Sequence, residues 1–242
     1  MGDRDLRGKV ALVTGAGRGL GCAIATALAD RGADVGLSYR ESRRGAEEAA
    51  QAIRRWGRRA FVGPADARMP GEMAGFVETA AAALGGLDLL VNNVGVFRRA
   101  PLEELTEEAL DEAFDVNVKA AVMASRAAAP HMRRRGGGAI VNVASLGCLR
   151  AWKSYLPYCT SKAALVMATR CLALALAPEI RVNAVAPGVL EPPGAEEALR
   201  KRVPLGRFGA LEEAVGAVLF LLSGAGYTTG EVVRVDGGRG VA

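Results

Sequence analysis

The sequence predicts an α/β protein: a doubly wound parallel sheet of about seven strands, flanked by helices. Short apolar runs alternate with longer segments of helical periodicity along all 242 residues, and a glycine-rich turn directly follows the first run. Half of the residues are hydrophobic, which is enough for one sizeable core. No repeat or linker interrupts the alternation, so we expect residues 1–242 to form a single domain.

Each element is predicted from its own apolar pattern. In the first helix, for example, Leu20, Ile24 and Leu28 lie at helical spacing. Strands are expected at residues 9–13, 34–38, 60–62, 87–91, 139–143, 181–185 and 231–235, and helices at 19–31, 43–56, 70–84, 105–134, 155–177 and 211–223. Parallel strands require right-handed crossovers, and such sheets bind their ligands at the carboxyl ends of the strands.

Composition and charge argue against two classes of partner. The net charge of +5 could attract nucleic acid, but basic residues are spread along the chain and aromatic residues for base stacking are few. We therefore expect no nucleic-acid partner. Residues 1–9 lack the apolar stretch of a secretory signal, and the apolar segment 163–177 is shorter than the roughly 20 residues that cross a bilayer. We expect no membrane span.

Cysteine and histidine usage limits the chemistry further. The four cysteines form no C-x-x-C pair, which fits a reducing cytoplasm. His131 is the only histidine, so a histidine base or metal site would depend on it alone. Its position beside Pro130 and before three arginines is typical of a helix end, where a cation suits the backbone carbonyls.

A phosphate-binding loop is predicted between the first strand and the first helix, where residues 14–21 read T-G-x-x-x-G-x-G. Gly15 permits a tight turn, Gly19 lets a pyrophosphate approach the backbone, and Gly21 lets the helix pack against the strand. Free N–H groups at the start of the helix, including that of Leu20, would hold the anion. The loop therefore predicts a dinucleotide cofactor.

The end of the second strand predicts which dinucleotide. NAD sites usually place an acidic side chain there, because a carboxylate accepts the ribose hydroxyls and repels a 2′-phosphate. This strand ends instead in Ser38, Tyr39 and Arg40, and Arg18 stands in the phosphate loop. Two guanidiniums and a hydroxyl can converge on a phosphate. The cofactor is therefore predicted to be NADP(H).

A tyrosine and a lysine four residues apart, Tyr158 and Lys162, form the predicted chemical centre. On a helix they share one face, and a nearby cation favours phenolate and lowers the pKa of a phenol. Ser145 follows the strand at 139–143, where its hydroxyl could hold a carbonyl oxygen. Asn117 lies within a predicted helix, although asparagine has a low helix propensity. This indicates that its side chain contacts water or the backbone.

Together these motifs resemble the short-chain dehydrogenase/reductase family, over essentially the whole chain. Asn117, Ser145, Tyr158 and Lys162 match its catalytic tetrad, and further segments match its cofactor contacts: Asp66 and Ala67 beside the adenine, Asn93 and Gly95 after the fourth strand, and Pro187, Gly188 and Val189 near the nicotinamide. The resemblance implies a Rossmann fold.

The resemblance also implies a reaction: hydride transfer between nicotinamide and the carbonyl carbon of a small-molecule substrate, without a metal. Tyr158 would donate the proton, Lys162 would bind the nicotinamide ribose, Ser145 would orient the carbonyl, and Asn117 would hold a water that relays protons. Members of the family are usually homotetramers, and here the helices at 105–134 and 155–177 could form the interfaces.

The substrate is less well determined. Residues 117–188 resemble 3-oxoacyl-carrier-protein reductases, which we favour, while Tyr39, Arg40 and a short, open substrate loop at about 190–204 resemble pteridine reductases. The family often has a threonine where this chain has Val189, so the Val189 backbone would have to bind the carboxamide. A dinucleotide-binding sensor without catalysis is the alternative from another class. Possible pocket walls are Val96, Phe97, Leu146, Cys148, Trp152 and Leu190.

Overall fold

A computed structural model describes residues 6–190 and 197–242. These residues form one seven-stranded sheet in the order β3-β2-β1-β4-β5-β6-β7, and every neighbouring pair is parallel. The predicted fold class is confirmed. The strands are β1 (Val10–Val13), β2 (Asp34–Tyr39), β3 (Ala60–Pro64), β4 (Leu89–Asn92), β5 (Gly138–Val143), β6 (Ile180–Pro187) and β7 (Val232–Val235).

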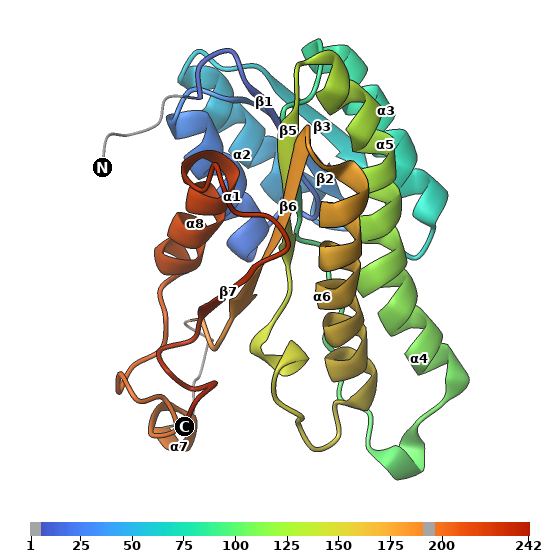
Figure 1. The fold of residues 1–242 in the computed structure, drawn as a ribbon, viewed down its shortest axis with the longest axis vertical. Coiled ribbons are helices and arrows are strands. Elements are labelled where there is room, and N and C mark those ends of the chain that lie inside the picture. Colours follow the sequence, from blue (N-terminus) through green and yellow to red (C-terminus); the bar gives the residue numbers. More distant parts are fainter. Residues whose placement is uncertain (1–5, 191–196) are drawn as a thin grey trace.

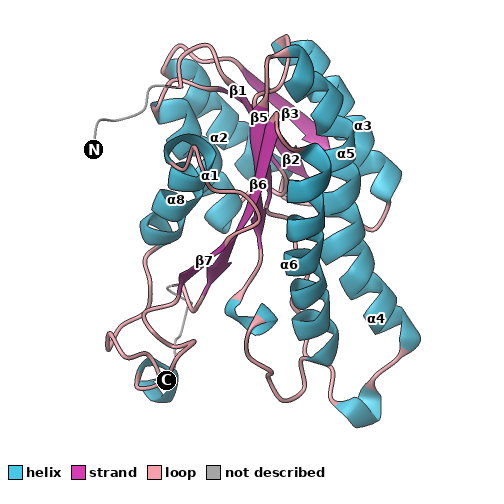
Figure 2. Ribbon diagram, in the orientation of Figure 1, coloured by secondary structure: helices cyan, strands magenta, loops and turns pink. Residues whose placement is uncertain are grey.

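Helices cover both faces of the sheet (Figure 1). On one face lie α1 (Gly19–Asp30), α2 (Arg43–Arg55) and α8 (Leu211–Leu219), and on the other lie α3 (Pro70–Leu84), α4 (Glu107–Phe114), α5 (Ala120–Arg134) and α6 (Leu156–Leu176). Figure 2 shows the strands between two layers of helices. Each layer buries its own apolar cluster against the strands, as expected for a doubly wound sheet.

Three local features differ from the sequence predictions. The helix predicted at 105–134 begins at Glu107 and is interrupted by a π-helical turn, Asp115–Lys119. The helix predicted at 211–223 likewise ends in a π-helical turn, Phe220–Gly224. A short helix α7 (Glu197–Arg200) lies in the predicted substrate loop, whose residues 191–196 fall outside the described residues. The π turns depend on tertiary contacts, which helical periodicity does not encode.

Helix α6 is long and apolar enough to cross a membrane by length and composition, and it extends beyond the apolar segment identified from sequence. Its packing is that of a helix in the core of a domain. Ser161 and Lys162 are buried on its inner face, and Leu165 and Val166 are buried beside them. Lys162 donates to a backbone carbonyl of β5, so this face is committed to the sheet.

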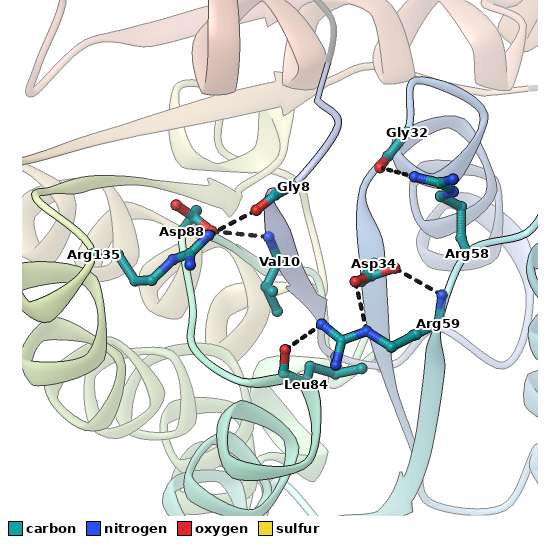
Figure 3. Close-up of polar contacts among 9 residues, drawn as sticks. All are labelled: Gly8, Val10, Gly32, Asp34, Arg58, Arg59, Leu84, Asp88 and Arg135. Carbon is teal, nitrogen blue, oxygen red and sulfur yellow. Dashed lines mark hydrogen bonds and ion pairs between the residues drawn. The ribbon is translucent and has the colours of Figure 1, made fainter.

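The amino-terminal edge of the sheet is held by carboxylate and guanidinium groups (Figure 3). Asp88 is 2% exposed; its Oδ2 accepts from Val10 N at 2.9 Å and from Arg135 at 3.1 Å, while Oδ1 accepts from Lys9 at 3.0 Å. Arg59 joins Asp34 on β2 to the last carbonyl of α3. These contacts fix the ends of β1, β2 and β4 opposite the predicted site.

At the carboxyl-terminal edge, the strand order reverses between β1 and β4. Chains leaving two such strands turn to opposite faces of the sheet, which opens a crevice between them. The loop after β1 and residues 93–97 after β4 border this crevice.

Candidate active site

The loop after β1 is tied to β2 and β4 by hydrogen bonds. Gly15 N donates to the hydroxyl of Ser38 at 3.0 Å, and the Asn93 amide donates to the carbonyls of Thr14 and Gly15 at 3.0 and 3.1 Å. The Thr14 hydroxyl in turn accepts from the backbone N–H of Asn93 at 2.9 Å. The loop is therefore rigidly placed before any ligand arrives.

The loop glycines have the positive φ angles or the close contacts that a tight turn requires. Gly15 has φ +65°, and a Cβ there would lie 2.8 Å from Val94 Cγ2. A Cβ on Gly21 would overlap the Asn93 amide and the Gly15 carbonyl. Gly19 has φ +55°, and a Cβ on it would meet nothing within 4 Å, so Gly19 faces open space where α1 begins.

A cavity of about 570 Å³ lies over this loop, within the size range of small-molecule sites. It gathers eleven of the residues predicted from sequence to bind the cofactor: Gly15, Arg18, Gly19, Leu20, Ser38, Tyr39, Arg40, Asp66, Ala67, Asn93 and Gly95. Two of the predicted pocket walls, Val96 and Phe97, also line it. Pro187, Gly188, Tyr158 and Lys162 do not, and Val189 lines a separate cavity of about 40 Å³.

Charged side chains border one corner of the cavity. Arg18 is exposed at its rim, and Arg40 forms an ion pair with Glu41, which also lines the cavity. Ser38 differs from expectation: it is fully buried and its hydroxyl oxygen accepts from Gly15 N–H, so it builds the loop instead of standing free for a phosphate. The guanidiniums of Arg18 and Arg40 are the cationic groups among the predicted residues that line this cavity.

Asp66 lies on the same side of the cavity and forms an ion pair with Arg68. The hydrogen bond from the guanidinium holds the pKa of the Asp66 carboxyl below its usual value. Asp66 therefore remains charged. Sequence analysis did not single out Arg68, nor Glu112, which also lines the cavity and pairs with Arg98 at 3.3 Å. Neither residue carries a motif that would have identified it.

The tetrad residues gather around the ends of β4 and β5. Asn117 lies in the π-helical turn, 1% exposed; its Oδ1 accepts from Val96 N at 2.8 Å, and its amide donates to Val96 O at 3.2 Å. The amide also donates to the Ser161 hydroxyl at 2.9 Å. The predicted backbone contact is thus present, and it explains an asparagine inside a helical segment. Through these hydrogen bonds the Asn117 side chain holds Val96, which follows β4, next to Ser161 on α6.

Lys162 is 3% exposed and donates to the carbonyl of Val143 at 2.7 Å. Gly95 is what makes room for it: a Cβ on Gly95 would lie 3.2 Å from Lys162 Nζ and 3.1 Å from Asn117 Oδ1. Ser145, 6% exposed, lies just after β5, where its hydroxyl oxygen accepts from Gly147 N at 3.2 Å. These contacts bring Asn117, Ser145 and Lys162 to one edge of the sheet.

The electrostatics of the Tyr158 phenol differ from the sequence prediction. We expected Lys162 to lower its pKa, but burial raises it, and the only opposing effect comes from a hydrogen bond with Ser145. The same burial lowers the pKa of Lys162 to about 8. The prediction failed because helical spacing fixes which residues share a face, but does not reveal how strongly the fold desolvates them.

Four aromatic rings meet at this position. Phe97 contacts Tyr158 edge to face with 4.7 Å between centroids, and Trp152 stacks on Tyr158 at 5.9 Å. Tyr155, which sequence analysis did not select, stacks on Phe97 at 4.7 Å. Phe97 is 59% exposed, so an apolar face is open beside the phenol. Of the other predicted walls, Leu146 is fully buried and belongs to the core, while Cys148 and Leu190 are partly exposed.

Comparison with known proteins agrees with this geometry. Residues 15–239 match the family model described as enoyl-(acyl carrier protein) reductase. An uncharacterized oxidoreductase of Methylorubrum extorquens is 40% identical, covering 96% of this chain and 98% of its own. L-xylulose reductase of Mus musculus is 39% identical over 98% of both chains. D-erythrulose reductase of Gallus gallus is 38% identical over 98% of this chain and 97% of its own.

Solved structures show the same architecture. A blue fluorescent protein from a metagenomic library, in complex with NADPH, superposes with a TM-score of 0.93 at 36% identity, covering 98% of this chain and 99% of its own. A short chain dehydrogenase from Burkholderia cenocepacia, in complex with NADP, gives 0.92 at 38% identity with the same coverage. With the tetrad residues gathered beside a dinucleotide-sized cavity, this chain belongs to the short-chain dehydrogenase/reductase family of oxidoreductases.

Proposed function

We propose that this chain is an NADP(H)-dependent reductase of small carbonyl compounds. The observation that carries the proposal is the placement of Ser145, Tyr158 and the buried ammonium of Lys162 around the end of β5, next to Phe97, which contacts Tyr158 and lines the cavity over the glycine loop. A proton donor, a hydroxyl that can hold the carbonyl oxygen and a fixed cation are the groups that such a reduction needs.

The cavity fits a phosphorylated dinucleotide. Gly19 presents backbone without a side chain at the start of α1, where a pyrophosphate would bind, and Arg18 and Arg40 would hold a ribose phosphate. Asp66 and Ala67 would border the adenine, and Asn93 and Gly95 would border the nicotinamide half. Two similar solved structures hold NADPH or NADP, which supports the assignment.

When bound, the reduced cofactor supplies a hydride to the carbonyl carbon. Tyr158 donates its phenolic proton to the carbonyl oxygen, so hydride and proton together convert the carbonyl to an alcohol. Because burial raises the pKa of Tyr158, the phenol keeps its proton at neutral pH until a substrate needs it. The Ser145 hydroxyl orients the carbonyl. The hydrogen bond between Ser145 and Tyr158, which lowers the pKa of the phenol, stabilises the phenolate left behind, which then recovers a proton from solvent.

Small hydroxy ketones are the substrates that the relatives favour. L-xylulose and D-erythrulose, which name two similar enzymes, both carry a ketone flanked by hydroxyl-bearing carbons. A 3-oxoacyl thioester is the second candidate, on the resemblance of residues 117–188 to 3-oxoacyl-carrier-protein reductases; the family model matched by residues 15–239 is described as an enoyl-(acyl carrier protein) reductase, which shares the acyl-carrier thioester but reduces a C=C bond. The exposed face of Phe97 could contact either substrate.

Loss of NADPH absorbance with four carbonyl compounds in parallel tests the proposal. L-xylulose, acetoacetyl thioester, dihydrobiopterin and 2,3-butanedione separate the hydroxy-ketone, 3-oxoacyl, pterin and general reductase functions. Tyr158→Phe should abolish every activity and leave NADPH binding largely intact, since the phenol supplies a proton and not a cofactor contact of large energy. Full activity in this variant would overturn the mechanism, and NADPH binding with no turnover on a broad panel would favour a sensor.

We also propose a homotetramer in a reducing cytoplasm. Met167 and Leu174, one face of α6, are 55% and 84% exposed in the single chain, and exposed apolar side chains on a long helix favour burial against another copy. All four cysteines are free thiols. Light scattering should give about four times the 25.1 kDa chain mass, whereas a 25.1 kDa species would contradict the proposal.

A further inference from the structure

The last residues of the chain pack against residues 145–148, here called the catalytic loop because it begins at Ser145. A Cβ on Gly240 would lie 3.0 Å from Leu146 Cδ1, next to Ser145. A Cβ on Gly237 would lie 2.6 Å from Val203, and Leu205 N donates to Gly237 O at 3.1 Å. Residues 237–242, here called the C-terminal tail, therefore form a wall between the catalytic loop and residues 203–205, beside α7 (Figure 1).

Specific hydrogen bonds hold the tail in this place. The Asp236 carboxylate accepts from the backbone N–H groups of Gly238 and Gly240 at 3.0 and 2.7 Å. Arg150, which follows the catalytic loop, donates to the carbonyls of Arg239 and Ala242 at 2.6 and 2.7 Å. Since both ends of the tail are fixed, the position of the Arg239 side chain is set by the fold.

Arg239 reaches back toward the catalytic tyrosine. Its guanidinium carbon lies 5.8 Å from the centroid of the Trp152 ring, and Trp152 stacks on Tyr158 with an interplanar angle of 18° and 5.9 Å between centroids. The guanidinium carbon therefore lies no farther from the centroid of the Tyr158 ring than the sum of these two distances. A cation over an aromatic face is also restrained in orientation.

Positive charge accumulates around Arg239. Partial burial and the nearby cations Arg150 and Arg202 lower its pKa, and Asp236 is the carboxylate that opposes them. Both oxygens of Asp236 already accept backbone N–H groups of the tail. Arg150 and Arg202 therefore add positive charge beside Arg239, and Arg234 brings a further guanidinium to this wall, since a Cβ on Gly240 would lie 3.5 Å from its Nη1. Like charges held together in this way repel one another, and an anion bound between them would relieve the repulsion.

We propose, building on the proposed carbonyl reduction, that Arg239 together with Arg150 and Arg202 binds a terminal anionic group of the substrate, a carboxylate or a phosphate monoester. A guanidinium offers planar, paired donors that match both groups. The carbonyl would lie at Tyr158 while the anion, a few bonds away along the substrate, lies at the tail. Such a substrate differs in charge from the neutral sugars that name the relatives.

Matched substrate pairs test the proposal kinetically. 4-Oxopentanoate and its methyl ester differ only in the anion, and xylulose 5-phosphate and xylulose provide the same comparison for a phosphate. We expect kcat/KM to be roughly tenfold or more higher for the anionic member of at least one pair, because charge-assisted hydrogen bonds are the strong ones. The pair that shows this difference tells whether the site prefers a carboxylate or a phosphate. Equal values within both pairs would overturn the proposal.

Variants separate the loss of anion binding from a general effect on the fold. Arg239→Gln should lower kcat/KM for the anionic member of a pair at least tenfold more than kcat/KM for the neutral member, and so remove the advantage of the anion. Arg55→Gln is the matched control, because it removes one exposed arginine on α2, at the opposite edge of the sheet, and should change neither value. An equal loss on both members of a pair in Arg239→Gln would show that the arginine only supports the fold, and would contradict anion binding.

A binding measurement tests the anion site separately from carbonyl reduction, because it does not depend on turnover. Trp56 and Trp152 are the two tryptophans, so a Trp56→Phe chain reports on Trp152 alone. With saturating NADP⁺, 4-oxopentanoate or xylulose 5-phosphate should change its fluorescence at concentrations at least tenfold lower than their neutral partners, and Arg239→Gln should remove that difference. This response without turnover would support the anion site while refuting the proposed reaction. No response to either anion would overturn the anion site.

Discussion

The buried ammonium of Lys162 should lower the free energy of unfolding of the chain, and this cost can be measured. Lys162 is 3% exposed, and burial lowers its pKa from the usual 10.5 to about 8. A base with a lowered pKa binds its proton less well in the folded than in the unfolded chain. The unfolded chain therefore binds more protons between about pH 8 and 10.5, and the stability contributed by this group rises with pH across that window.

The magnitude follows from the two pKa values. At pH 7 the charged side chain costs about 3 kcal/mol relative to the neutral form, and the cost falls by about 2 kcal/mol by pH 9.5. Replacing Lys162 by methionine removes the titration. We therefore expect Lys162→Met to lose activity while gaining free energy of unfolding relative to the parent at pH 7, and to lose most of that advantage at pH 9.5. The lost hydrogen bond to Val143 offsets part of the gain.

Urea unfolding of both chains at matched concentration, from pH 7 to 9.5, measures this difference. Taking the difference between the two chains cancels titrating groups that do not interact with Lys162, including Tyr158, whose pKa is raised by burial. The thiol of Cys148 does interact with Lys162, so both chains should carry Cys148→Ser. Lys201→Met, at an exposed lysine, controls for the loss of one charge. A parent-to-variant difference that does not change with pH would refute the claim that this ammonium is desolvated.

Three further variants probe the cofactor loop and the opposite edge of the sheet. Arg18→Ala combined with Arg40→Asp should shift the ratio of kcat/KM from NADPH toward NADH, and an unchanged ratio would remove the assignment of the phosphate site. Gly21→Ala should weaken NADPH binding, measured by titration, and destabilise the chain by about 2 kcal/mol, because its Cβ overlaps the Asn93 amide. Asp88→Ala should cost about 2 kcal/mol in urea unfolding without changing KM, since its cationic partners remain partly solvated.

Much of the fold could be predicted from sequence because its signals are local. The helix predicted at 70–84 is present with the same bounds, and all seven predicted strands are present with ends shifted by at most two residues. The failures have a different cause. In the π-helical turn at Asp115–Lys119, the Asn117 side chain binds the backbone of Val96, a contact that leaves no periodic pattern in the sequence. The helix Glu197–Arg200 is too short to show one.

For the site, sequence identified the groups better than their environments. It selected eleven residues that line the cavity, because glycines at a strand–helix turn have a geometric reason to be there. It misassigned the hydroxyl of Ser38, placed Leu146 on a pocket wall, and gave the wrong direction for the pKa of Tyr158. Each of these errors concerns burial or a partner that comes from another strand or helix.

By itself, the sequence determined the parallel α/β fold and the glycine turn between β1 and α1, because spacing along a strand or helix dictates which side chains share a face. The residues proposed to carry the chemistry were identified through their resemblance to the family. Only the tertiary structure decided how those groups are tuned. It desolvates Lys162 and Tyr158, it commits the Asn117 side chain to the backbone of Val96, and it brings Arg239 over Trp152 from the far end of the chain. Desolvation and long-range contact depend on the whole packed fold, which local spacing does not contain.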